Sequence, residues 1–296
     1  MAAQVTDLEL HALIGTAWRD YGLIDSGNGR KLERYGPYRF IRPEPQAMWA
    51  PTTSDWDADA EFVPGADDEG GGRWQFARAV PSKGWPLEWE DVRFMAQTTP
   101  FRHLGFFPDM APVWTWMSHR LAGRAAPQCL NLFGYTGVGS LALARTGAQV
   151  THVDASRKSV ECAKQNAKLS AMDDRPIRWL VDDAAKFTAR EVRRGKRYDG
   201  ILIDPPKYGR GPEGEIWRLE EGLPALIADA RKLLDQESAF LFLTVYAVRM
   251  SAFAIGELLR AHLGDLGGNI DCGELGVREE GRGLILPTAI FARWTA

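Results

Sequence analysis

The segment 201–211 carries residues whose types and spacing could hold a substrate. An apolar run ends there in the tripeptide Asp204-Pro205-Pro206, and Lys207 and Tyr208 follow. Each proline lacks a backbone N–H and fixes φ, so the tripeptide sets a rigid turn whose carbonyl groups stay free to accept hydrogen bonds. Such a turn suits a substrate amine. We therefore predict that these five residues form the catalytic site.

A glycine-rich segment follows an earlier apolar run. It reads Asn131-Leu132-Phe133-Gly134-Tyr135-Thr136-Gly137-Val138-Gly139-Ser140. Glycines let the backbone approach a ligand closely, and the N-terminus of a following helix presents free N–H groups to the carboxylate of an amino-acid moiety. The spacing GxxGxG differs from the dinucleotide-binding GxGxxG. A tight strand-to-helix turn without a ligand is the alternative interpretation.

Acidic residues close the next two predicted strands. Asp154 could accept hydrogen bonds from a ribose hydroxyl pair, or it could cap the helix that is predicted to begin near Ser156. The third strand ends in Asp182-Asp183-Ala184, where an acid could accept from an adenine amine while the next backbone N–H donates to the ring. We favour Asp183 over Asp182 for this role.

Taken in order, these features resemble the S-adenosylmethionine-dependent methyltransferases and, within them, the bacterial 23S ribosomal RNA large-subunit methyltransferases. The resemblance covers roughly residues 98–296 and implies S-adenosylmethionine as cofactor and RNA, in particular ribosomal RNA, as substrate. The phrases that carry it are Leu-Asn-Leu-Phe-Gly-Tyr-Thr-Gly (130–137), Val-Asp-Ala-Ser (153–156), Asn-Ala-Lys-Leu (166–169) and Asp-Pro-Pro-Lys-Tyr-Gly-Arg-Gly (204–211).

The resemblance also implies which residues hold the cofactor. In the family a Gly-Phe-x-x-Asp segment closes over the cofactor, and the segment 105–109 is similar to it, although Met110-Ala111 replace the usual polar partners. The expected cofactor-binding residues are Asp109, Asn131, Phe133, Gly134, Tyr135, Thr136, Gly137, Asp154, Ala155, Ser156, Asp183, Ala184 and Asp204.

Two departures from the family narrow the chemistry. Relatives that methylate carbon 5 of cytosine attack the ring with a cysteine after the fourth or fifth strand, and the turns at 204–207 and 244–247 contain none. The N-terminal RNA-binding module of many relatives, the PUA module, is not recognisable either. Enzymes that methylate base nitrogens use a similar Asp/Asn-Pro-Pro-aromatic turn, but here the fourth position is Lys207 and the aromatic Tyr208 follows it.

These features predict direct transfer of a methyl group to a base heteroatom, with nitrogen favoured. Asp204 and the carbonyl group of Pro205 would orient the amine, and Tyr208 would support a base taken out of its stack. Lys207 could contact a phosphate or form a structural ion pair. Arg210 and Arg218 could add contacts to the RNA backbone.

The surrounding pattern predicts an α/β fold, a Rossmann-like, doubly wound and mostly parallel sheet with an antiparallel C-terminal hairpin. We expect a β-rich N-terminal domain over 1–97, which could recognise the substrate, and the methyltransferase domain over 98–296. Strands are expected near 128–133, 148–153, 177–181, 199–204 and 239–245, with a late strand pair at 269–279 and 284–294. Helices are expected near 111–123, 138–146, 156–170, 184–194, 217–234 and 249–262.

Composition excludes several classes of protein. Hydrophobic residues make up 45% and charged residues 25% of the chain, which is typical of a globular protein. No apolar run approaches the ~20 residues that cross a bilayer, and no signal pattern opens the chain, so a cytoplasmic location without membrane contact is expected. The three cysteines have no metal-ligand spacing, so no metal is expected.

Several alternatives stay open. A net charge of −3 argues against holding duplex RNA by charge alone, and the basic run 190–197 precedes the fourth strand, at the opposite end of the sheet from the ligands. The basic and aromatic segment 30–42 could contact RNA or form a solvated hairpin. Methylation of a small molecule or protein side chain, a scaffold that binds the cofactor without catalysis, and a nicotinamide oxidoreductase are the other candidate functions.

Overall fold

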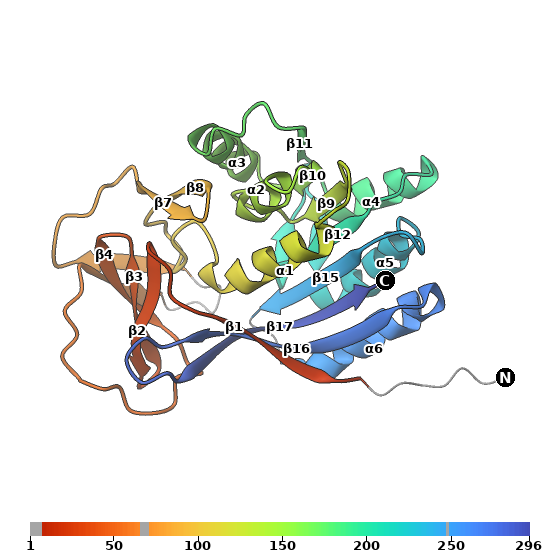
Figure 1. Ribbon diagram of the computed structural model, residues 1–296. Coiled ribbons are helices and arrows are strands. Elements are labelled where there is room, and N and C mark those ends of the chain that lie inside the picture. Colours follow the sequence, from red (N-terminus) through yellow and green to blue (C-terminus); the bar gives the residue numbers. More distant parts are fainter. Residues whose placement is uncertain (1–7, 66–70, 247–248) are drawn as a thin grey trace.

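The structure is a computed structural model that describes residues 8–65, 71–246 and 249–296. Within these residues an eight-stranded sheet has the order β1-β16-β17-β15-β12-β9-β10-β11 (Figure 1). Its strands are β1 (Leu10–Gly15), β9 (Gln128–Leu132), β10 (Gln149–Asp154), β11 (Ile177–Val181), β12 (Gly200–Ile203), β15 (Phe240–Tyr246), β16 (Asn269–Arg278) and β17 (Ile285–Thr295). Strands β9, β10, β11, β12 and β15 are parallel, and β17 pairs antiparallel with β15 and β16. The predicted doubly wound sheet with a late antiparallel pair is confirmed.

Helices cover both faces of this sheet (Figure 1). One buried apolar cluster joins α1, α2 and α3 to one face, and a second joins α4, α5 and α6 to the other. Side-chain oxygens of Ser156, Asp183 and Ser251 accept from first-turn N–H groups and so fix the starts of three helices. The helices are α1 (Ala111–Leu121), α2 (Val138–Ala144), α3 (Arg157–Leu169), α4 (Ala184–Arg193), α5 (Leu219–Arg231) and α6 (Ala252–Leu263).

The N-terminal region is rich in β structure, as predicted. A five-stranded sheet has the order β2-β3-β4-β5-β6, and β7 pairs with β8 in a separate hairpin. The strand bounds are β2 (Tyr21–Gly27), β3 (Arg30–Tyr35), β4 (Tyr38–Pro43), β5 (Ala60–Pro64), β6 (Gly72–Phe76), β7 (Trp85–Trp89) and β8 (Val92–Ala96). Strand β1 instead pairs in parallel with β16 and extends the large sheet. The domain boundary at residue 97 stays a prediction.

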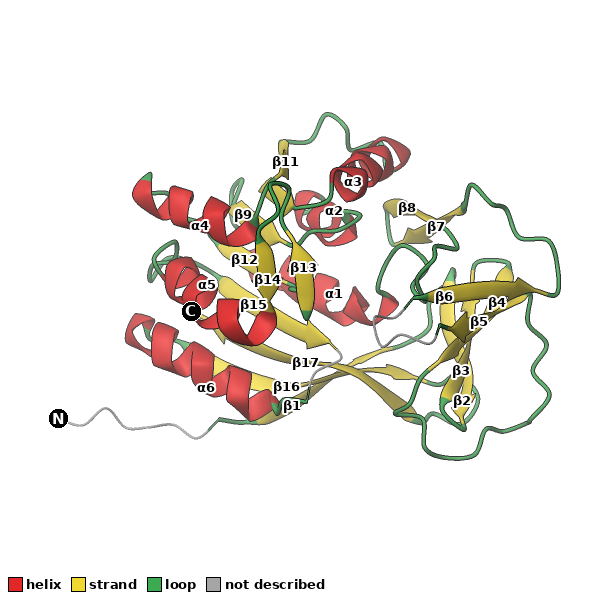
Figure 2. Ribbon diagram, turned by 180° about the vertical axis from the view of Figure 1, so that it is seen from behind, coloured by secondary structure: helices red, strands yellow, loops and turns green. Residues whose placement is uncertain are grey.

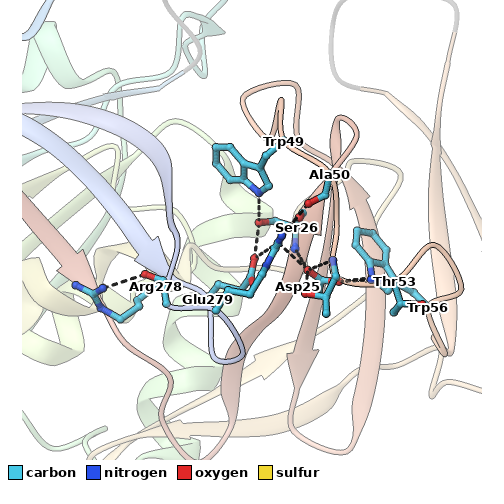
Figure 3. A network of polar contacts seen from close by, with 11 residues as sticks. Asp25, Ser26, Trp49, Ala50, Thr53, Trp56, Arg278 and Glu279 are labelled. Atoms are coloured by element: carbon cyan, nitrogen blue, oxygen red, sulfur yellow. Dashed lines mark hydrogen bonds and ion pairs between the residues drawn. The ribbon is translucent and has the colours of Figure 1, made fainter.

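The tip of the β16–β17 hairpin contacts the N-terminal sheet through a polar network (Figure 3). The Arg282 guanidinium donates to Asp25 Oδ1 at 2.8 Å and to Glu279 Oε1 at 2.6 Å. The Ser26 hydroxyl donates to the second Glu279 oxygen at 2.8 Å. Asp25, Ser26 and Glu279 are buried. This network therefore holds the five-stranded sheet against the strands of the large sheet.

One element differs from the prediction. The expected helix over 217–234 begins only at Leu219, because residues 216–218 form a strand, β14 (Ile216–Arg218), that pairs antiparallel with β13 (Tyr208–Arg210). The two short strands form a hairpin between β12 and α5 (Figure 2). Among the described residues, no helix is long and apolar enough to cross a membrane.

Candidate functional site

A pocket lies at the carboxyl ends of β9 and β12. Three segments supply its walls: the residues around the 3-10 helix η1 (Pro108–Met110), the glycine-rich loop after β9, and the end of β12. The lining residues are Phe106, Phe107, Met110, Trp114, Asn131, Phe133, Gly134, Tyr135, Thr136, Val138, Gly139, Leu202 and Asp204. Six predicted site residues therefore meet at one pocket, namely Asn131, Phe133, Gly134, Tyr135, Thr136 and Asp204.

The glycine-rich loop has an unusual backbone. Phe133 and Tyr135 adopt φ values of +57° and +48°, a left-handed conformation that costs energy for residues with a side chain. Gly137 adopts φ +83° just before α2, and this conformation carries no such energy cost because glycine has no side chain. Gly134 passes so close to His152 that a Cβ atom there would lie 2.4 Å from the ring. Backbone strain of this kind, at residues other than glycine, is found most often at functional sites.

Asp154 fixes this loop from the end of β10. Its carboxylate accepts from the backbone N–H groups of Tyr135 and Ser156, each at 2.8 Å. Burial raises the pKa of Asp154, although these two hydrogen bonds oppose the rise. The cap of α3 is Ser156, whose Oγ accepts from Ser159 N–H at 3.2 Å, so the alternative role of Asp154 as the cap is wrong. Asp154 and its neighbour Ala155 lie outside the pocket lining, beside the loop.

The two acids after β11 have different partners. Asp182 forms an ion pair with Arg190. Asp183 caps α4 by accepting from Lys186 N–H at 2.8 Å through Oδ1, directly before the buried Ala184. Both acids are therefore engaged by a neighbour, and our preference for Asp183 rests on the sequence alone. Its adenine-binding role stays a prediction, because neither Asp183 nor Ala184 lines the pocket.

A series of hydrogen bonds between buried polar side chains supports the glycine-rich loop. Asn131 Nδ2 donates to Ser140 Oγ at 2.9 Å, and Ser140 Oγ lies 2.9 Å from His152 Nδ1. Burial lowers the pKa of His152 to about 3, so its ring is neutral. Sequence reasoning named Asn131 but missed Ser140 and His152 as its partners. The signal was a histidine two residues before the acid that ends the strand.

The Asp-Pro-Pro turn supplies one acid and one free carbonyl group. Asp204 Oδ1 accepts from the Thr244 hydroxyl at 2.5 Å. The carbonyl oxygen of Pro206 accepts from Trp217 Nε1 at 2.8 Å, so the prediction that this carbonyl stays free is wrong. No hydrogen bond among the described residues ends on the carbonyl oxygen of Pro205. Pro206, Lys207 and Tyr208 are exposed and do not line the pocket.

A second acid, Asp109 of η1, lies near Asp204. Burial raises the pKa of Asp204 to about 7, and repulsion from Asp109 adds to the rise, while the Thr244 hydrogen bond opposes it. Burial raises the pKa of Asp109 as well. Tyr246 and Thr288 lie beside the Asp109 carboxyl group, yet Asp109 Oδ2 and the Tyr246 hydroxyl make no hydrogen bond within the described residues. Buried unpartnered acceptors of this kind favour a cationic or hydrogen-donating ligand.

A family model for S-adenosylmethionine-dependent methyltransferases matches residues 71–234, which is more than half of the chain. The chain belongs to this family. A S-adenosylmethionine-dependent methyltransferase from Agrobacterium tumefaciens is 42% identical, covers 99% of this chain and 97% of its own, and superposes with a TM-score of 0.92. SMU.776, a methyltransferase complexed with SAH, shares the fold at 16% identity and a TM-score of 0.69 over 90% of this chain and 72% of its own.

Relatives whose names state a substrate are similar over a smaller part of this chain. Ribosomal RNA large subunit methyltransferase I of Escherichia coli O139:H28 is 35% identical over 133 residues, which is 44% of this chain and 32% of the relative. The protein of the same name from Klebsiella pneumoniae strain 342 is 36% identical over 93 residues, 30% of this chain and 23% of the relative. The chain thus matches about a quarter to a third of the length of these curated relatives.

The pocket of this methyltransferase fits its cofactor. S-adenosylmethionine carries an ammonium group and a sulfonium centre. Asp109 does not line the pocket itself but lies between the lining residues Phe107 and Met110, and its buried Oδ2, which has no hydrogen-bond partner among the described residues, offers an acceptor for such a group. The glycine-rich loop brings backbone close to the pocket and leads into the N-terminus of α2, where N–H groups can meet a carboxylate. Asp109 and the N-terminus of α2 would together hold the amino-acid part of the cofactor.

Three further residues belong to the site although sequence reasoning did not name them. Phe107 packs against Tyr246, with ring centroids 5.3 Å apart, and against Tyr135 at 5.9 Å. Thr244 holds Asp204. Tyr246 and Thr244 both come from β15, so the fifth parallel strand contributes hydroxyl groups where some relatives are expected to contribute a thiol. None of the three cysteines lines the pocket, and Cys129 and Cys272 are buried.

Proposed function

We propose that the enzyme transfers a methyl group to a heteroatom, with nitrogen favoured, of an RNA base, and that ribosomal RNA is the substrate. One observation carries the proposal: Asp204 lines a pocket that contains no cysteine among the described residues, and the carbonyl oxygen of the next residue, Pro205, accepts no hydrogen bond within the described residues. Two hydrogen-bond acceptors suit an amine. Carbon 5 of a pyrimidine needs a nucleophile that this pocket lacks.

The RNA part of the proposal is supported by the relatives. Those from E. coli and K. pneumoniae carry the name of a ribosomal RNA large subunit methyltransferase and are 35% and 36% identical to this chain over 133 and 93 residues. We also propose that residues 1–97, which have a five-stranded sheet of their own, contribute to recognition of the substrate.

When bound, S-adenosylmethionine supplies an electrophilic methyl group. Asp204 accepts an N–H of the substrate and thereby directs the nitrogen lone pair away from the turn. The nitrogen gives up a proton once it is methylated, and the Asp204 carboxylate is placed to take it. A pKa of about 7 matches that task at neutral pH. Thr244 keeps the carboxylate in place.

The test is transfer of labelled methyl groups. The protein is incubated with labelled S-adenosylmethionine and, separately, with intact ribosomes, naked ribosomal RNA and a protein extract, and modified nucleosides are identified by mass spectrometry. We expect label in RNA on a base nitrogen. Label in protein alone would overturn the RNA substrate, and label on a pyrimidine carbon 5 would overturn the heteroatom target. Asp204→Asn provides the matched inactive enzyme.

A further inference from the structure

The β13–β14 hairpin has two faces of different character. Tyr208 lies opposite Arg218, and Arg210 lies opposite Ile216, so these four side chains share one face. The intervening pair, Gly209 and Trp217, belongs to the other face. The exposure of the side chains agrees with this division. Trp217 is buried, whereas Tyr208, Arg210, Ile216 and Arg218 are exposed.

The inner face fixes the hairpin to the site. Trp217 packs against Phe133, a pocket residue, with ring centroids 5.0 Å apart, and donates to the Pro206 carbonyl oxygen at 2.8 Å. The start of α5 fits closely under the indole ring, since a Cβ atom on Gly222 would lie 2.6 Å from it. The outer face is therefore held at a fixed place beside the Asp-Pro-Pro turn.

The outer face combines exposed apolar surface with positive charge. Tyr208 and Ile216 are 50% and 60% exposed, which is unusual for large apolar side chains that share one face of a hairpin. The flanking cations are Arg210 and Arg218, and Lys207 lies in the preceding turn. Arg218 pairs with the exposed Glu221 at 3.1 Å, a surface contact that contributes little free energy.

The acids of the hairpin are directed elsewhere. Lys186 of α4 forms ion pairs with Glu213 and Glu215, at N–O distances of 3.2 Å and 2.5 Å. Hydrogen bonding to Lys186 lowers the pKa of Glu215 to about 2. Both loop acids are thus held by Lys186 on the side of α4, and the cations on the outer face are Arg210 and Arg218.

We propose that this outer face binds single-stranded RNA beside the target base. Tyr208 stacks on a base that flanks the target, and Arg210 and Arg218 contact the adjoining phosphates. Aromatic rings framed by cations are the usual means of holding unpaired nucleic acid, because every base offers a π face and every nucleotide a charge. The inference rests on the proposed RNA substrate and assigns Tyr208 to a flanking nucleotide, since its ring lies outside the pocket.

The experiment measures binding of a short fluorescent single-stranded RNA to the full chain by anisotropy over a series of salt concentrations. The variants are Tyr208→Ala, Tyr208→Phe, and Arg210→Ala combined with Arg218→Ala. Leu10→Ala is a control for loss of an exposed apolar side chain, because Leu10 is 58% exposed at the start of β1. Arg193→Ala at the end of α4 is the control for loss of an exposed arginine.

We expect Tyr208→Ala to weaken RNA binding by about 5- to 100-fold, and Tyr208→Phe, which keeps the ring, to bind nearly as the wild type does. The double arginine variant should lower the slope of log affinity against log salt by about 1.4, the value for two phosphate contacts on a single strand. The affinity for S-adenosylmethionine should be unchanged in every variant, which shows that the site is intact.

Three results would overturn the inference in distinguishable ways. If the wild type methylates RNA but the hairpin variants bind it as the two controls do, the docking face is wrong and the proposed function stands. If the wild type methylates only protein, the RNA substrate fails and the docking face fails with it. Equal binding of duplex and single-stranded RNA, with no effect of Tyr208→Ala, would also refute the stacking role.

Discussion

The indole Nε1 of Trp217 donates a hydrogen bond to the carbonyl oxygen of Pro206 at 2.8 Å. Pro206 belongs to the turn that follows β12, and Trp217 belongs to β14, eleven residues further along the chain. Because proline residues cannot donate backbone hydrogen bonds, the turn has few means of fixing its own position. The indole supplies one and thereby ties the turn to the hairpin.

Trp217→Phe should therefore impair turnover more than cofactor binding. Phenylalanine keeps much of the packing on Phe133 but loses the donor, so the turn loosens. We expect kcat to fall roughly five- to tenfold, the equivalent of one net hydrogen bond, with an unchanged Kd for S-adenosylmethionine. Trp74→Phe is the matched control, since Trp74 Nε1 also donates to a backbone carbonyl, that of Thr99, at 2.8 Å. Equal kinetic losses in both variants would contradict this role.

The rate of methyl transfer should depend on the ionisation of Asp204. Its pKa is raised to about 7, and only the ionised carboxylate can take a proton from the substrate. The rate should therefore be low at acidic pH, rise through about pH 7 and level off above it. Single-turnover measurements over this range test the expectation. A profile that stays flat, or that falls with rising pH, would exclude Asp204 as the proton acceptor.

Much of the sheet could be predicted because its signals are local. The five parallel strands are largely apolar runs, and three of them end at or directly before an acid, namely Asp154, Asp182 and Asp204. Their predicted bounds differ from those of the structure by at most one residue. Strand β1 could not be found in this way, because its partner β16 lies more than 250 residues away in the sequence. Its pairing depends on tertiary contacts that no short window contains.

The site was predicted unevenly for the same reason. The glycine-rich loop and the acids at strand ends stand out in the sequence, and Asp204 lies where the turn suggested. Trp217 was assigned to a helix, because three-residue strands leave no periodic pattern. The electrostatic repulsion of Asp204 by Asp109 also could not be predicted, since it joins a segment before the first parallel strand to the end of the fourth.

Asp204→Asn should make the protein more stable at alkaline pH while it abolishes transfer. The folded-state pKa of about 7 lies above the ordinary value of 3.8, so the folded protein binds the proton more tightly than the unfolded chain does. In the wild type, the ionised Asp204 carboxylate lowers the free energy of unfolding. This loss is absent below about pH 4, grows as the pH rises toward 7 and is complete above it. We expect a gain of about 1–3 kcal/mol at pH 8 and little change at pH 4, measured by urea denaturation.

A wild type and variant that differ equally at both pH values would show that this carboxyl group titrates normally in the folded state. The same urea data on Asp183→Asn serve as the comparison. Asp183 caps α4, and its replacement by Asn, which keeps a side-chain oxygen, should change stability by less than about 1 kcal/mol.

Arg282→Met should destabilise the junction between the N-terminal sheet and the large sheet. The change leaves the buried carboxylates of Asp25 and Glu279 without their shared cation. Loss of one partner from a buried ionic group costs about 3 kcal/mol, which thermal unfolding can detect. Arg278→Met is the control in the same hairpin, because the exposed Arg278 donates only to the carbonyl oxygen of Gly283. Equal melting temperatures for the two variants would show that the network in Figure 3 carries little free energy.

Gly137→Ala and Gly147→Ala separate the role of the glycine-rich loop in cofactor binding from plain backbone strain. The two glycines have nearly the same left-handed φ, +83° and +88°, so an added Cβ atom strains both backbones alike, at about 1 kcal/mol. At Gly147 the Cβ atom meets nothing within 4 Å, whereas at Gly137 it would lie 2.6 Å from Ala163 Cβ and push the loop away from α3. Both variants should lose stability, but only Gly137→Ala should weaken S-adenosylmethionine binding, by about tenfold or more in calorimetry. Unchanged cofactor affinity in a folded Gly137→Ala protein would mean that the loop does not form the cofactor site, because its displacement would then cost the ligand nothing.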